Sequence, residues 1–80
     1  MSDEILVALN RMIKEVKPEV TLEAGKHLKE DIGLDSLDII SLLFEAERHF
    51  DISIPEEDID AHDLFHVDKL IAYIAQKRGH

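Results

Sequence analysis

Two stretches of the chain have apolar residues at every third or fourth position, which is the spacing of an amphipathic helix. In the first stretch, about residues 3–17, the apolar positions are Ile5, Leu9, Met12, Ile13 and Val16. Pro18 ends this helix, because the residue before a proline is pushed out of the helical region. In the last stretch, about residues 64–77, the apolar positions are Leu64, Val67, Leu70, Ile71 and Ile74.

A third predicted helix, about residues 36–50, carries two apolar stripes instead of one. At about 100° per residue, one stripe contains Ile39, Leu42, Leu43, Ala46 and Phe50, and the other contains Leu37, Ile40 and Phe44. A helix that packs only into its own bundle needs a single stripe, so the second stripe is a candidate binding surface. The alternative is that the preceding loop folds over Leu37 and Ile40. On the far side, five residues are expected to be solvated: Asp38, Ser41, Glu45, Arg48 and His49.

A long loop and a short helix complete the predicted fold. Residues 18–34 form a loop that is tied down by the apolar residues Val20, Leu22, Leu28 and Ile32, and its length predicts that it joins two helices that run parallel. Pro55, followed by acidic residues, predicts a short helix at about 55–61. The sequence therefore predicts an all-α protein: a small four-helix bundle with three longer helices, one short helix and a long first loop. Residues 1–80 are expected to form a single domain.

Composition and charge narrow the range of functions. The 80 residues, 45% of them hydrophobic, suffice for one modest core, and the absence of cysteine excludes disulfides and cysteine-based zinc or redox sites. Without a leader or an apolar run of membrane-spanning length, the protein is expected to be cytoplasmic. Residues 30–63 hold twelve acidic residues and one basic residue. This acidity disfavours nucleic acid as a partner and favours basic protein surfaces, although its role could be limited to solubility.

The junction between the long loop and the middle helix holds the candidate chemistry. Asp35 is a favoured N-cap residue, and Ser36 follows it in the first helical turn. A phosphate on the Ser36 hydroxyl would be stabilised by the positive end of the helix dipole. Taken alone, the two residues are also an ordinary capping pair.

Three stretches of the chain stand out together: residues 27–38, HLKEDIGLDSLD; residues 50–58, FDISIPEED; and residues 67–74. They resemble, in this order, the attachment-site signature, a second characteristic segment and the last helix of acyl carrier proteins. The resemblance implies that Ser36 carries 4'-phosphopantetheine, which a phosphopantetheinyl transferase attaches from coenzyme A. Acyl groups would be held as thioesters on the distal thiol, and the protein is expected to be a monomer.

The resemblance also implies a partner surface around the serine. Asp35 would orient the site, and Leu37 would contact the prosthetic group. The expected partner-binding residues combine apolar and acidic side chains: Asp38, Ile40, Phe44, Glu47, Ile54, Glu56 and Glu57. They would meet acyl-transferring and acyl-modifying enzymes with basic surfaces, in fatty acid, polyketide or lipid biosynthesis. The bundle interior would shelter the acyl chain.

Departures from the family pattern imply a specialised carrier instead of a housekeeping one. The family commonly has a glutamate where this chain has Ser41 and a methionine where it has Phe44. Arg48 and His49 place positive or titratable charge on a normally acidic face. These differences bear on which enzymes the protein serves.

Two other functions are considered as alternatives to an acyl carrier. A peptidyl or aryl carrier of an amino-acid assembly line is disfavoured by Asp35, because such domains usually show a G-G-x-S-L site. A helical interaction module that never carries a group is the second alternative. An enzyme is not expected, because the histidine nearest to Ser36 in the sequence, His27, lies in the loop with nothing to orient it as a base.

We expect no metal site from the sequence. His62 and His66, beside Asp58 or Asp63, have a spacing that would suit zinc, but His62 is expected to precede the last helix. The acidic residues of 58–63 lack the glycine and the final glutamate of a calcium-binding loop. Weak binding of divalent ions by the acidic residues stays open.

Overall fold

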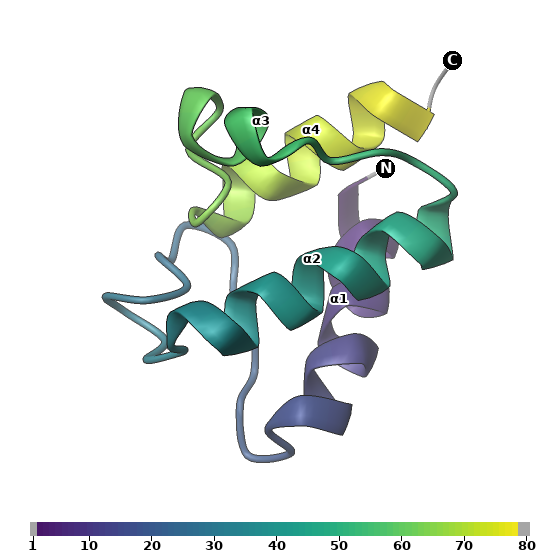
Figure 1. Cartoon of the computed structure of the whole chain (residues 1–80). Helices are drawn as coiled ribbons and strands as arrows, with labels where there is room; N and C mark the ends of the chain where they lie inside the picture. The colour runs from purple at the N-terminus through teal and green to yellow at the C-terminus, as the bar shows by residue number, and fades with distance from the viewer. Residues whose placement is uncertain (1, 79–80) are drawn as a thin grey trace.

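The computed structural model describes the backbone of residues 2–78 and the side chains of residues 4–78. Within residues 2–78, four helices follow one another: α1 (Ser2–Val16), α2 (Ser36–Phe50), α3 (Glu56–Ala61) and α4 (Val67–Arg78) (Figure 1). The predicted all-α, four-helix fold is confirmed. The largest difference in bounds is at α4, which was predicted from residue 64. Its start is delayed because Asp63 has a left-handed backbone, with φ of 54°, and residues 62–65 form a turn.

The core lies between α1, α2 and α4. Each of these helices buries the apolar face that its sequence spacing predicted, except that Val16 at the end of α1 is 36% exposed. The fully buried residues include Ile5, Leu9, Ile13, Ile39, Leu42, Leu70 and Ile74. Two loop residues, Leu22 and Leu28, are buried in the same cluster, which confirms that apolar anchors hold the long loop. The short helix α3 contributes no buried residue.

The helices α1 and α2 run in opposite directions, so the prediction that the long loop joins parallel helices is wrong. Lys17, directly after α1, has its Nζ 3.4 Å from Oδ2 of Asp38 in the first turn of α2. At the opposite end, Glu4 of α1 and His49 of α2 line one groove. The loop therefore starts and finishes at the same end of the bundle.

The loop is long because it travels to α4 and back. Figure 1 shows it leaving the end of α1, reaching the start of α4 and returning to α2. At the far point, the Leu28 amide donates to the Phe65 carbonyl at 2.6 Å, and the Val67 amide donates to the Lys26 carbonyl at 3.0 Å. Loop and helix thus form a short antiparallel contact centred on His27 and His66.

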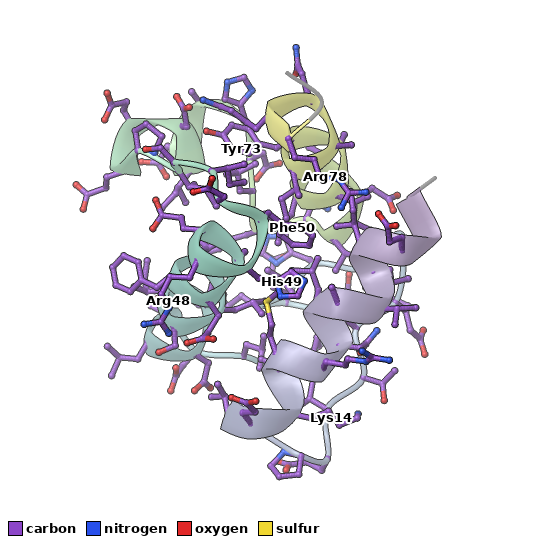
Figure 2. The ribbon with its side chains drawn as sticks, turned by 90° about the vertical axis from the view of Figure 1, so that its right-hand side faces the viewer. Lys14, Arg48, His49, Phe50, Tyr73 and Arg78 are labelled. Carbon is purple, nitrogen blue, oxygen red and sulfur yellow. The ribbon has the colours of Figure 1, made fainter. Side chains whose placement is uncertain are left out.

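The end of α4 closes the bundle at the opposite side. Arg78 forms an ion pair with Glu4 of α1, and its guanidinium lies over the Phe50 ring at the end of α2, 5.5 Å from the ring centroid (Figure 2). These contacts join α4 to both other long helices. Among the described residues, no helix combines the length and the apolar character that crossing a membrane requires.

Candidate functional site

Ser36 begins α2 and is held by a reciprocal capping box. Oδ1 of Asp35 accepts from the Asp38 amide at 2.8 Å, and Oδ2 of Asp38 accepts from the Asp35 amide at 3.4 Å. The predicted cap is therefore confirmed. Because these bonds fix the backbone on both sides of Ser36, the serine has a defined position although its side chain is exposed.

Gly33 allows the loop to turn into this helix. Its φ is 94°, a conformation that side chains with a Cβ rarely adopt. The next residue, Leu34, is 1% exposed, and its amide donates to the Leu28 carbonyl at 3.0 Å. The turn therefore carries the chain from the buried loop anchor to the exposed serine within a few residues.

The charges around Ser36 are partly balanced within the protein. The pKa of the Asp35 carboxyl is lowered, first by the hydrogen bond from the Asp38 amide and further by the nearby Lys17. Lys17 also pairs with Asp38, whose side chain is only 15% exposed. The expectation that Asp38 is solvated is therefore wrong, because the capping box and the ion pair cover it.

The second apolar stripe of α2 faces solvent at two of its three positions. Leu37 is 78% exposed and Phe44 is 61% exposed, whereas Ile40 is half-buried and packs against the core. The loop leaves Leu37 uncovered. An apolar surface consequently extends from the position beside Ser36 along the outside of α2.

The acidic candidates differ in what they contact. Glu56 and Glu57 are exposed in the first turn of α3. Glu47 is half-buried, and its Oε2 accepts from the Ile54 amide at 2.7 Å, which closes the turn between α2 and α3. Ile54 is only 8% exposed and belongs to the core. We therefore remove Ile54 from the candidate partner surface.

The positions that depart from the family pattern lie on or beside this surface. Ser41 is exposed, and the Arg48 side chain is 74% exposed while forming an ion pair with Glu45 of the same helix. His49 is also exposed, with its ring edge against Phe50 (Figure 2). The positive charge of Arg48 is therefore available to a partner, although Glu45 offsets part of it.

Tyr73 holds α3 in place, a role that sequence reasoning missed. Its hydroxyl donates to Oδ2 of Asp58 at 2.6 Å, and the tyrosine is 6% exposed. Burial and then the Asp58 carboxylate raise the pKa of Tyr73 above its ordinary value. A single tyrosine on the buried face of the last helix was the available signal, because a buried hydroxyl needs a partner.

The histidines group differently from the sequence expectation. The His62 ring lies beside Tyr73, with 5.4 Å between ring centroids, while His66 and Asp63 approach His27. Potential ligand atoms of these last three residues all lie within 4.8 Å of one another. Sequence spacing did not reveal this cluster, because the contact of the long loop with α4 creates it.

Comparisons with known proteins converge on one family. A family described as "Phosphopantetheine attachment site" matches residues 4–74. An acyl carrier protein of Amoebophilus asiaticus is 46% identical over 59 residues, which cover 74% of this chain and 69% of that protein. An acyl carrier protein of Exiguobacterium sp. is 36% identical over 77 residues, which cover 94% of this chain and 95% of that protein.

Proposed function

Because this chain belongs to the acyl carrier protein family, we propose that Ser36 is the residue that carries its 4'-phosphopantetheine group. The observation that carries the proposal is the capping box of Asp35 and Asp38 around an exposed serine. Such a serine is rigid in position and open to a transferase. The chain contains no cysteine, so a thiol has to come from an added group.

The residues around Ser36 fit a phosphodiester. The hydroxyl lies at the positive end of the α2 dipole, which favours an anion there. Asp35 directs its carboxylate to the Asp38 amide, and Lys17 partly neutralises Asp38. The hydrogen bond and the ion pair both reduce the repulsion between these carboxylates and a phosphate. When bound, the group supplies a thiol on a flexible arm, which holds an acyl group as a thioester.

The partner surface that we propose has an apolar centre and an acidic rim. Leu37 and Phe44 supply exposed apolar contact beside the arm, and Ile40 lies half-buried between them. Glu56 and Glu57 lie exposed at the start of α3. An acidic rim steers basic enzymes toward the apolar contact. Asp38 and Glu47 add to the negative field, but their carboxylates also hold the fold together.

The enzymes that this surface serves would be a phosphopantetheinyl transferase and the acyl-transferring and acyl-modifying enzymes of fatty acid, polyketide or lipid biosynthesis. Ser41, Phe44 and Arg48 indicate a specialised member. A partner enzyme with a basic patch that fits a glutamate at position 41 would contact the Ser41 hydroxyl here. The same patch would be repelled by the guanidinium of Arg48. The protein would act as a carrier, with the chemistry done by its partners.

An acyl chain would enter the bundle beside α3. This helix is six residues long and buries none of them, and Tyr73 attaches it to α4 through Asp58. Moving α3 therefore disturbs few buried contacts, whereas moving α1, α2 or α4 opens the core. We propose that α3 shifts outward to admit the chain.

Incubation with coenzyme A and a broad-specificity phosphopantetheinyl transferase tests the attachment site. The intact mass should rise by one phosphopantetheinyl unit in the wild type and in Ser41→Ala, which removes another exposed serine of α2. Ser36→Ala should stay unmodified. An unmodified wild type would favour a helical interaction module, and modification of Ser36→Ala would place the group elsewhere. Loading the modified protein with acyl or aminoacyl groups then separates an acyl carrier from a peptidyl carrier.

A further inference from the structure

His27 and His66 oppose each other where the long loop meets the start of α4. The hydrogen bonds of Leu28 to Phe65 and of Val67 to Lys26 flank them, so they form a non-hydrogen-bonded antiparallel pair. Side chains of such a pair leave the backbone on the same side and at close separation. The two rings are 4.8 Å apart between centroids and nearly perpendicular, at 83°.

Asp63 adds a carboxylate to this pair of imidazoles. Its Oδ2 lies 3.6 Å from Nε2 of His66, and potential ligand atoms of Asp63, His66 and His27 lie within 4.8 Å of one another. We propose that these three residues bind a divalent transition-metal ion of the zinc type. This site was not expected from the sequence, and it does not depend on the carrier function.

The donor set selects the class of ion. Two imidazole nitrogens and one carboxylate oxygen suit zinc and its neighbours, whereas magnesium and calcium require oxygen ligands. Ligand atoms around a tetrahedral zinc ion are about 3.3 Å apart, given bond lengths of about 2.0–2.1 Å. Side-chain rotations that move each ligand atom by about 1 Å would therefore bring the three ligands to zinc-binding distances. The fourth position would be open to water, because Asp63 is exposed.

Three existing contacts have to be released when the ion binds. Nδ1 of His27 accepts from the amides of Lys29 at 3.1 Å and Glu30 at 3.0 Å, so the neutral ring carries its proton on Nε2. Coordination through Nε2 moves this proton to Nδ1, and the ring turns away from the two amides. Lys69, whose Nζ lies 3.4 Å from Oδ2 of Asp63, also withdraws. Lys29, Glu30 and Lys69 are all exposed, so water replaces the lost partners.

Zinc titration of the full chain tests the site. The protein should be free of an affinity tag and unmodified at Ser36, so that no added histidine or thiol binds zinc. We expect one zinc ion per chain by calorimetry, a higher melting temperature with zinc and no competition from excess magnesium. In nuclear magnetic resonance spectra, the amide signals of Lys29 and Glu30 should shift when zinc is added, because they lose their acceptor.

Three variants separate this site from surface binding. His66→Ala should weaken zinc binding by about tenfold or more, the scale on which metal affinity responds even to outer contacts. His27→Asn should have the same effect while keeping an acceptor near the position of Nδ1, so the turn is preserved. His62→Ala, which changes an exposed histidine outside the cluster, should bind zinc like the wild type.

Three results would overturn the proposal. The first is a wild type that binds no zinc or is not stabilised by it. The second is zinc affinity that is unchanged in both His66→Ala and His27→Asn. The third is equal weakening in His62→Ala, which would indicate diffuse binding to surface histidines.

Discussion

Replacing Tyr73 with phenylalanine should loosen α3 while leaving the rest of the bundle intact. The change deletes the hydroxyl that donates to Asp58 at 2.6 Å and keeps the ring, which is 6% exposed in the core. A hydrogen bond to a charged acceptor contributes about 1.5–3 kcal/mol. Because Asp58 is half-buried and water can solvate its carboxylate, we expect the lower value, about 1.5 kcal/mol. For a domain of this size, the melting temperature should fall by about 6–12 °C.

The same contact predicts how stability depends on alkaline pH. The pKa of Tyr73 in the folded protein is raised, chiefly by burial and then by Asp58, so the unfolded chain loses this proton first, near pH 10. The stabilisation is complete below about pH 10 and is lost as the pH rises toward the folded pKa. Tyr73→Phe should lack this loss of stability.

Ultraviolet absorbance of tyrosinate measures the predicted pKa directly, because the chain has one tyrosine and no tryptophan. Thermal unfolding of wild type and Tyr73→Phe, at neutral pH and above pH 10, gives the stability difference. Amide exchange should accelerate in α3. A native titration midpoint at the ordinary tyrosine value, or Tyr73→Phe as stable as wild type, would refute the reasoning.

Two further predictions concern charge. Ser41→Glu combined with Arg48→Glu should lower the KM of a general fatty acid ketosynthase for the acylated protein by about tenfold, with a smaller effect on kcat; a higher KM in steady-state kinetics would contradict the proposed specialisation. Moderate salt should raise the melting temperature, because a Debye length of about 10 Å at 0.1 M screens the twelve acidic residues and one basic residue of 30–63. An unchanged or lower melting temperature would exclude self-repulsion as a significant term.

Local signals predicted the helices and the N-cap of α2 well. Pro18 and Pro55 mark the end of α1 and the start of α3 to within one residue, and Asp35 is the N-cap of α2. These features depend on residues close in sequence, where proline geometry and capping chemistry decide the conformation. The two stripes of α2 were also readable, since helical periodicity alone separates the buried Ile39 from the exposed Leu37.

Features that depend on contacts between distant segments were missed. Loop length gave no information on the direction of α2, because the loop is long enough to reach Phe65 and Val67 and to return to the same end of the bundle. Asp63 has a left-handed backbone, so α4 begins after it and not directly at residue 64. The sequence did not show this, because aspartate is also a favoured N-cap residue. Ile54 belongs to the alternating pattern Ile52-Ser53-Ile54, which is compatible with exposure or burial. In the structure, its amide donates to Glu47 in a turn that places the side chain in the core.

The backbone around the proposed attachment site is held by the segment before α4 as well as by α2. The Phe65 carbonyl before α4 accepts from Leu28, and the Leu28 carbonyl accepts from Leu34, one residue before Asp35. Leu28 and Leu34 are both buried, so neither hydrogen bond is readily exchanged for water. Ser36 follows at the end of this series and is fixed on its other side by the capping box. The protein backbone thus holds the serine in one place, and the mobility that a carrier needs in order to visit several enzymes has to come from the attached arm.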